Sequence, residues 1–236
     1  MLNETCILAG TAATIGFIHT VFGPDHYLPF IVLAKARRWS SVKTAMITFL
    51  CGVGHVLSSI VLGFIGIALG TAVLKLEMAE SFRGELAAWF LLVFGFTYFV
   101  WGIHKAIRSR PHEHFHQHES GDVHIHTHKH IVDHSHVHSS KSNNLTPWIL
   151  FTIFVFGPCE PLIPFVMYPA AKGNMITVAI VSFSFGLTTV ATMLGIVLAL
   201  SFGLSKLPLR RVERYSHALA GLVIFLCGGA IKFLGL

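Results

Sequence analysis

The stretch FGPDHYLPF occupies residues 22–30, inside a run of residues that is otherwise apolar enough to lie in a membrane. A second stretch, FGPCEPLIPF, occupies residues 156–165 in another such run. In both stretches Gly-Pro is followed closely by a carboxylate, Asp25 in the first and Glu160 in the second. Proline removes a helical hydrogen bond and glycine frees the backbone, so each stretch predicts an interrupted membrane helix.

The composition is that of a membrane protein with several spans. The 236 residues are 53% hydrophobic and 12% charged, with a mean hydropathy of +0.68, whereas soluble domains are about a quarter charged. No basic region precedes the first apolar segment, so we expect no cleaved signal peptide. Six apolar segments reach the length of about 20 residues that a bilayer requires, and they cover residues 11–33, 45–70, 86–103, 148–170, 176–202 and 215–236.

The basic residues are unevenly divided between the loops. The loops after the first, third and fifth segments hold 13 of the 17 Lys and Arg residues, and the other positions hold 4. The positive-inside rule places the first set in the cytoplasm, and both termini then face outward. We therefore expect a multi-pass protein of the cell (inner) membrane. This distribution accounts for the net charge of +6 without a nucleic-acid partner.

The two interrupted stretches also belong to a longer internal repeat. The helix-break residues correspond at an offset of 134, and glycines in the two following segments correspond at offsets of 132 and 133. A nearly constant offset predicts a duplicated three-helix unit, and chance alignment of common membrane residues is the alternative. Three spans are an odd number, so the second copy would enter the membrane from the opposite face. The break residues are Gly23, Pro24, Gly157 and Pro158.

We therefore predict an all-α membrane protein of six transmembrane helices in two inverted three-helix repeats. The first repeat would cover residues 1–107 and the second residues 145–236, with a His-rich cytoplasmic loop at residues 108–144. The first and fourth helices would be discontinuous. In transporters, discontinuous helices meet at a binding site near the middle of the bilayer.

Ionisable residues at the breaks favour a binding site over a simple proline kink. Of the 11 acidic residues, only Asp25 and Glu160 lie within the apolar segments, where an unpartnered carboxylate costs several kcal/mol. Counting from the nearest basic residue puts both of them, and His55, about 18 Å from a polar edge, near the middle of a core about 30 Å thick. The alternative for the histidines is that they only pack.

Imidazole, carboxylate and thiolate ligands suit nickel, cobalt, zinc or iron(II) better than magnesium or calcium. We expect a divalent transition-metal ion as the substrate, with no organic cofactor and no catalytic residue. The partners are then the metal ion and the lipid bilayer. The candidate metal ligands are His19, Asp25, His26, His55, Cys159 and Glu160.

A polar segment between the third and fourth apolar segments holds 11 of the 16 histidines. It cannot bury a core, so we expect it to be disordered without metal. Neutral imidazoles at this density bind borderline divalent cations weakly and at many sites, and a solvated linker is the alternative. Its histidines are His112, His114, His116, His118, His124, His126, His128, His130, His134, His136 and His138.

GFIHTVFGPDHYLPFIVLAKARRW, residues 16–39, followed by GVGHVLSS, residues 52–59, resembles the nickel/cobalt transporter superfamily. The chain is most similar to the urease-accessory-type membrane proteins of that superfamily. The resemblance implies that the three histidines of these motifs and Asp25 contact a transported Ni²⁺ or Co²⁺ ion, which would move by alternating access. It also implies cytoplasmic metallochaperones or nickel-enzyme maturation proteins as partners.

Two other classes of function remain open. FGPCEPLIPF is similar to the Pro-Cys motif of membrane thiol–disulfide carriers related to cytochrome c biogenesis, which would make the chain a transmembrane electron carrier. Disulfide exchange uses two cysteines, and the repeat places Asp25 opposite Cys159. The other class is a membrane-bound metal sensor, or a chaperone-like partner of a metalloenzyme, that moves no ion.

Overall fold

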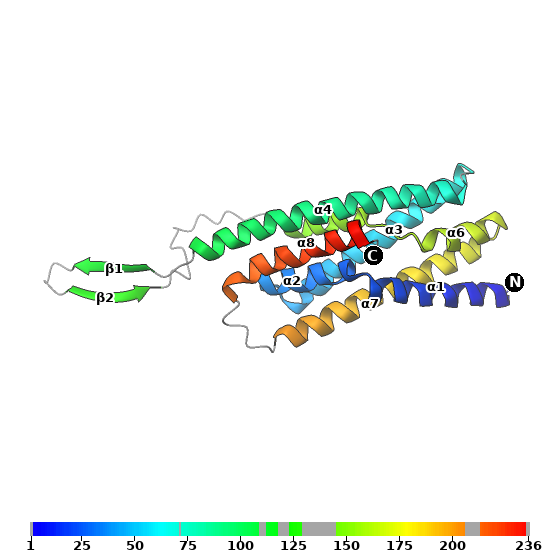
Figure 1. Ribbon diagram of the computed structural model, residues 1–236. Helices are drawn as coiled ribbons and strands as arrows, with labels where there is room; N and C mark the ends of the chain where they lie inside the picture. The colour runs from blue at the N-terminus through cyan, green and yellow to red at the C-terminus, as the bar shows by residue number, and fades with distance from the viewer. Residues whose placement is uncertain are drawn as a thin grey trace.

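The computed structural model describes residues 2–70, 72–108, 112–117, 123–128, 145–205 and 213–234. Most of these residues form a bundle of long helices, and a two-stranded hairpin lies beyond the end of α4 (Figure 1). The elements are α1 (Leu2–Phe22), the 3₁₀ turn η1 (Pro24–His26), α2 (Leu28–Ala36), α3 (Ser41–Ala68), α4 (Val73–Arg108), β1 (His112–Gln117), β2 (Val123–His128), α5 (Thr146–Phe156), α6 (Leu162–Ala171), α7 (Met175–Ser205), the 3₁₀ turn η2 (Glu213–Tyr215) and α8 (Ser216–Leu234).

Five helices of the described chain are long and apolar enough to cross a membrane. The protein is therefore a multi-pass membrane protein. The spans are Asn3–Phe22, Ser41–Ala68, Val73–Arg108, Met175–Leu204 and Glu213–Leu234. The fourth predicted segment is represented by two shorter apolar helices, α5 and α6.

Both predicted interruptions are present. The second separates α5, of 11 residues, from α6, of 10 residues, and at 1.5 Å per residue neither helix alone spans a core about 30 Å thick. The first follows α1, which has 21 residues and begins at Leu2 rather than near residue 11. Glu4, the charge near its start, is paired with Lys172. The first break therefore lies after a full-length helix rather than in the middle of one.

The order of one interrupted helix followed by two long helices occurs twice along the chain. The long helix α4 packs along α8, and α1 packs along α7 (Figure 1). α3 lies against both α5 and α7. The contact between α4 and α8 is close enough that a Cβ on Gly95 would lie 2.3 Å from the backbone nitrogen of Phe225.

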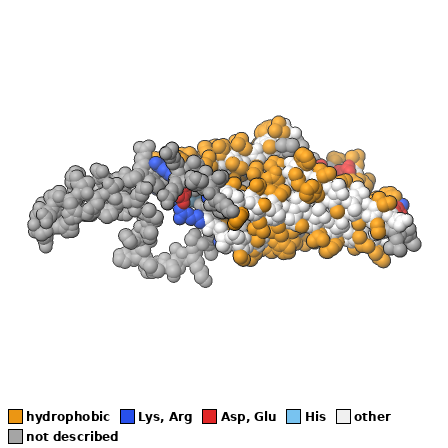
Figure 2. Space-filling view, turned by 90° about the horizontal axis from the view of Figure 1, so that it is seen from below, with side chains coloured by type: hydrophobic (Ala, Val, Ile, Leu, Met, Phe, Trp, Pro, Cys, Tyr) orange, Lys and Arg blue, Asp and Glu red, His pale blue; other side chains and the backbone are white. Residues whose placement is uncertain are grey.

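Buried apolar side chains form two clusters. One, which includes Phe30, Phe154 and Ile224, joins α2, α5 and α8. The other, which includes Val56 and Phe185, joins α3 and α7 with the second break and α6. The outer surface of the bundle is also largely apolar, with Lys and Arg gathered at one end (Figure 2). A lipid-facing surface of this kind is expected for a membrane bundle.

The His-rich segment differs from the prediction of disorder. β1 and β2 form an antiparallel pair in which His112, His114 and His116 are opposite His128, His126 and His124. Every second residue of the two strands is a histidine and the residues between include Phe115, Val123 and Ile125, a period-two pattern with β-forming residues. His118, His130, His134, His136 and His138 lie outside the described residues.

Candidate functional site

The first break places His26 and Asp25 next to the end of α1. The helix ends where the Gly23 N–H donates to the His19 carbonyl at 3.0 Å, and the His26 N–H then donates to the Gly23 carbonyl at 3.0 Å. A Cβ on Gly23 would lie 2.5 Å from Nδ1 of His26. This turn therefore needs glycine at position 23, and the tight fold brings the His26 ring back beside His19.

Three histidines from the first half of the chain meet beside this turn. The ring centroids of His19 and His26 are 4.7 Å apart, and those of His26 and His55 are 5.0 Å apart. Within the described residues, His19, His26 and His55 form a group of possible metal ligands whose donor atoms all lie within 4.8 Å of one another. Ligand nitrogens around a tetrahedral zinc ion lie about 3.4 Å apart, so the donor atoms need to approach one another by at most about 1.4 Å.

The hydrogen bonds of the rings leave one nitrogen of each free to bind a metal. Nδ1 of His55 lies 3.3 Å from the Phe154 carbonyl, and Nδ1 of His26 lies 3.2 Å from both the Gly23 carbonyl and Oδ1 of Asp25. These oxygens accept, so in both rings Nδ1 carries the proton and Nε2 keeps its lone pair. In the described structure the Nε2 atoms of His19, His26 and His55 are buried without a hydrogen-bond partner.

Asp25 supports this cluster through His26. Its carboxylate lines the same small cavity, of about 60 Å³, as the three histidines, but it does not belong to the group of donor atoms. A histidine that ligates a metal through one nitrogen commonly donates its other N–H to a carboxylate or a backbone carbonyl. His26 and His55 both have that arrangement.

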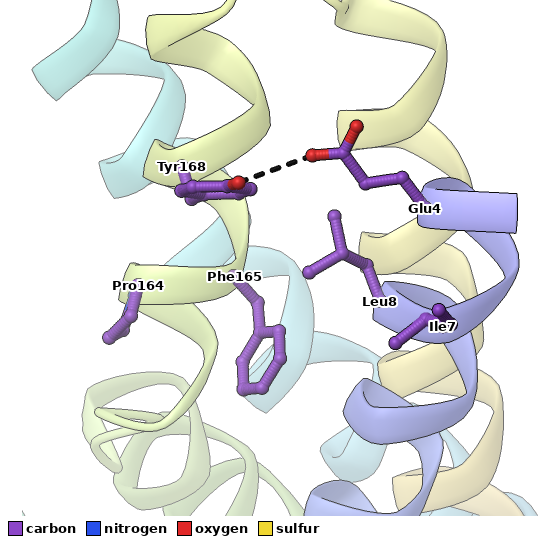
Figure 3. Close-up of a pocket in the computed structure, with 6 residues that line it drawn as sticks. All are labelled: Glu4, Ile7, Leu8, Pro164, Phe165 and Tyr168. Carbon is purple, nitrogen blue, oxygen red and sulfur yellow. Dashed lines mark hydrogen bonds between the residues drawn. The ribbon is translucent and has the colours of Figure 1, made fainter. Parts of the chain in front are cut away.

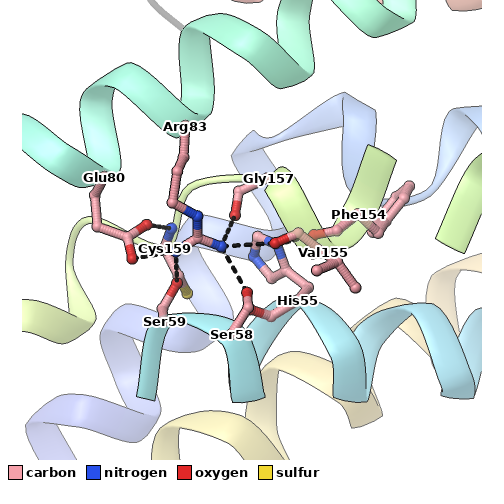
Figure 4. A network of polar contacts seen from close by, with 9 residues as sticks. All are labelled: His55, Ser58, Ser59, Glu80, Arg83, Phe154, Val155, Gly157 and Cys159. Atoms are coloured by element: carbon pink, nitrogen blue, oxygen red, sulfur yellow. Dashed lines mark hydrogen bonds and ion pairs between the residues drawn. The ribbon is translucent and has the colours of Figure 1, made fainter. Parts of the chain in front are cut away.

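The second break is held by charged side chains of α4 (Figure 4). Arg83 donates to the carbonyl of Val155 at 2.6 Å and to that of Gly157 at 3.4 Å, next to the proline that interrupts the helix. It also forms an ion pair with Glu80 at 2.5 Å. The other carboxylate oxygen of Glu80 accepts the Cys159 N–H at 3.1 Å.

The second break also approaches the histidine cluster. A Cβ on Gly157 would lie 2.9 Å from Nδ1 of His55, and the Phe154 carbonyl accepts from the same nitrogen. Cys159 and Glu160 follow the break but are not part of the group of donor atoms. The Cys159 side chain is fully buried, whereas Glu160 is exposed.

Glu80 and Arg83 are the site residues that the sequence analysis missed. The side chain of Glu80 is 0% exposed, so the statement that only Asp25 and Glu160 lie within apolar segments is wrong. α4 begins at Val73, well before the predicted segment at residues 86–103, and this extension carries Glu80 into the bundle. Their spacing in the sequence indicates an ion pair, because an acidic residue and an arginine three residues apart lie on one face of a helix.

All four cysteines are free. Cys51 is buried in the cluster that contains Ile153 and Phe154, and Cys227 is buried on α8. Cys6 is exposed. Cys159 alone lies in a helix break.

A second, larger cavity lies between the start of α1 and α6 (Figure 3). Its volume is about 540 Å³, and apolar side chains such as Leu8 and Phe165 line most of it. At its rim Tyr168 donates to Glu4 at 3.2 Å, and Lys172 donates to the same carboxylate oxygen at 2.5 Å. None of the predicted site residues lines this cavity.

The chain matches the family described as "Cytochrome C biogenesis protein transmembrane region" over residues 28–230. This match covers most of the 236 residues, and the chain belongs to that family. No curated protein and no solved structure matches the chain.

Family membership corrects two predictions. The assignment to the nickel/cobalt transporter superfamily is wrong, and transport of divalent metal ions, which followed from it, is contradicted. Thiol–disulfide electron carriage, the alternative indicated by FGPCEPLIPF, is supported instead. His19, Asp25 and His26 lie before residue 28, where the family match begins, whereas the match extends over both halves.

Proposed function

We propose that the protein carries reducing equivalents across the membrane by thiol–disulfide exchange at Cys159. The observation that carries the proposal is the family match together with the position of Cys159 in the second helix break, two residues before Pro161 at the start of α6. Burial in apolar surroundings opposes the thiolate, the form that attacks disulfides, whereas an adjacent arginine favours it.

One thiol in this protein is sufficient for electron transfer if the donor and the acceptor each contribute two cysteine sulfurs. The Cys159 thiolate attacks the disulfide of an acceptor protein, forming a mixed disulfide and releasing one acceptor thiolate, which takes a proton. A donor dithiol protein on the other face then attacks the Cys159 sulfur and releases the second acceptor thiol. The second donor thiol breaks the donor–Cys159 bond and regenerates Cys159. In total the donor loses two electrons and two protons, and the acceptor gains them.

The buried state of Cys159 implies that the break opens before either partner reaches the sulfur. Its side chain is 0% exposed, so neither partner reaches the sulfur in this conformation. We therefore place the chain in a closed state, with opening at the two breaks as the step that exposes the thiol.

The test is electron transfer in vesicles that contain only this protein. A dithiol protein of the thioredoxin type is enclosed, and a fluorogenic peptide disulfide is added outside. We expect Cys159→Ser to abolish reduction of the peptide. Cys6→Ser, which removes the exposed thiol of α1, is the matched control and should keep the wild-type rate. Wild-type transfer by Cys159→Ser would overturn the proposal.

The two halves are proposed to be inverted repeats, with the His-rich segment in the cytoplasm and both termini outside. The helix contacts support this arrangement, because α1 packs on α7 and its counterpart α5 packs on α3. Gly95 and Gly228, which correspond at an offset of 133, both lie where α4 meets α8. The sidedness rests on the distribution of Lys and Arg between the loops.

A second function is favoured by the three free imidazole nitrogens. The cluster of His19, His26 and His55 is suited to hold a divalent transition-metal ion that stays bound, with zinc, nickel, cobalt or iron(II) matching its ligands. Three nitrogen ligands and an adjoining cavity of about 60 Å³ leave a coordination position open. Such a site would make the chain a metal-dependent sensor or a partner of a metalloenzyme.

This second function is tested by metal binding to the purified full chain. Competition with a chromophoric zinc chelator should reveal one tight site above the weaker binding of the His-rich segment. His55→Ala should remove that site. His104→Ala removes an exposed histidine of α4 and should leave it intact. Equal zinc binding by both variants would exclude the cluster as the tight site.

A further inference from the structure

The ion pair of α4 occupies the point where the second break loses its helical hydrogen bonds. Gly157 and Pro158 interrupt the helix, and Arg83 supplies donors to the carbonyls of Val155 and Gly157. In a bilayer core, interrupted backbone persists only where protein groups satisfy it. A planar guanidinium with five N–H donors is suited to this task, because one side chain serves several acceptors.

Arg83 also joins the break to α3. It donates to Oγ of Ser58 at 2.6 Å and to Oγ of Ser59 at 3.3 Å. Three elements therefore meet at one side chain, namely α3, α4 and the break between α5 and α6 (Figure 4). The Arg83 side chain is only 16% exposed and Glu80 is 0% exposed, so each charge depends on the other for compensation.

The same pair acts on Cys159. Glu80 accepts the Cys159 N–H at 3.1 Å, which fixes the backbone of the residue that carries the thiol. Burial in apolar surroundings has the largest effect on the Cys159 thiol and opposes the thiolate, and Glu80 and Arg83 are the charged groups that act on the same sulfur. A positive charge favours the thiolate and a negative charge opposes it.

The other charged and titratable groups near the break are differently placed. Glu160 adjoins Cys159 but is exposed. His55 of α3 faces Gly157 and donates to the Phe154 carbonyl. The two α4 side chains are therefore the buried charges in direct contact with the segment that presents Cys159.

We propose that Glu80 and Arg83 are positioning residues that hold the second break closed over Cys159 and set the reactivity of its thiol. This inference deepens the thiol–disulfide function and rests on it. Glu80 holds the Cys159 backbone, and Arg83 holds the carbonyls on the other side of Pro158. Release of this pair is the local event that opens the break to a partner disulfide.

The test measures the rate at which N-ethylmaleimide alkylates Cys159 in the full chain, resolved by mass spectrometry, as a function of pH. In Arg83→Gln we expect the pH midpoint of alkylation to rise by about one unit or more, because the favourable charge is lost. In Glu80→Gln it should fall by about the same amount. If the two residues had a purely structural role, the alkylation rates of both variants would change in the same direction. The pH midpoint would then stay at the wild-type value.

Two further variants separate charge from hydrogen bonding. Arg83→Lys keeps the charge but lacks the planar fork, so we expect a wild-type midpoint with alkylation about tenfold faster at high pH. Arg38→Gln breaks the exposed pair between Arg38 and Glu213, which joins the end of α2 to η2, and should match the wild type. If Arg83→Gln does not fold, Arg83→Lys and Glu80→Gln still give both readouts.

The inference is overturned if the Arg83 and Glu80 variants share the wild-type midpoint, if they shift in one direction, or if Cys159 stays unreactive in all of them. This outcome differs from failure of the thiol–disulfide function itself. That failure would appear as wild-type electron transfer in Cys159→Ser, whatever the alkylation profile.

Discussion

At the scale of single residues, His55 is the point where the two breaks meet. Its Nδ1 donates to the Phe154 carbonyl at the end of α5, and the ring belongs to the cluster formed with His19 and His26. Gly157 lies directly against the same ring. The orientation of the His55 imidazole therefore depends on a backbone segment 99 residues away in the sequence.

This dependence makes Gly157→Ala a sharp test at the residue scale. The new Cβ would lie 2.9 Å from Nδ1 of His55 and 3.1 Å from the Phe154 carbonyl, so the ring must move. We expect zinc affinity to fall about 10- to 100-fold, as for loss of a group that orients a ligand, with about 1–3 kcal/mol lost from stability. Chelator competition and thermal unfolding measure the two effects.

Gly10→Ala is the control for that variant, because a Cβ at Gly10 meets nothing within 4 Å. It should bind zinc as the wild type does and be equally or more stable, since alanine favours helix. Unchanged zinc affinity in Gly157→Ala would show that the His55 ring is not held by the second break.

The proximity of Asp25 to the three histidines was predictable from sequence, but the placement of Glu80 and Glu160 was not. Counting residues from a basic edge predicts the depth of a side chain and says nothing about which way it points. His19, His26 and His55 share both depth and direction, whereas Glu160 is exposed. Glu80 is buried because Arg83 on the next turn compensates its charge, and that pairing depends on contacts with α3 and the second break.

At the scale of elements, the contact between α4 and α8 depends on the absence of side chains. A Cβ on Gly95 would lie 2.3 Å from the Phe225 nitrogen, and one on Gly221 would lie 2.2 Å from the Phe99 nitrogen. Backbone atoms cannot rotate away as a side chain can. Small residues at close helix crossings are common in membrane bundles, where packing rather than water exclusion drives association.

Gly95→Ala should therefore separate the two helices. We expect the apparent melting temperature to fall, corresponding to about 1–3 kcal/mol or more, as for insertion of a methyl group into a packed core. Gly229→Ala on α8 places its Cβ in open space and serves as the control. Melting of both variants in the same detergent measures the difference, and equal temperatures would contradict the close contact.

Sequence patterns located the long helices and both breaks, but not all of their limits. Hydropathy marks the apolar part of a helix and misses polar turns that continue it, as at the start of α4 (Val73–Arg108). It likewise misses the first turns of α1 (Leu2–Phe22). Charges in these turns have partners in the structure, as Glu4 has in Lys172, and no local pattern reports partners that are distant in sequence.

At the scale of the whole molecule, the family match and the local motifs lead to different functions. His19 lies near the end of α1, and Asp25 and His26 lie in the first break, all before residue 28, where the family match begins. The match over residues 28–230 includes both halves. The three-histidine cluster lies beside the first break, while Cys159 lies in the second break.

The sidedness of the bundle is the last prediction and applies to the molecule as a whole. The start of α1 and the end of α4 lie at opposite ends of the bundle (Figure 1), and from the excess of Lys and Arg we expect the end of α4 to face the cytoplasm. In a Cys6→Ser background, Asn3→Cys should react with a membrane-impermeant maleimide in intact cells. His104→Cys should react only after permeabilisation. Labelling of both positions from the same face would exclude this topology, because α4 could not then end opposite the start of α1.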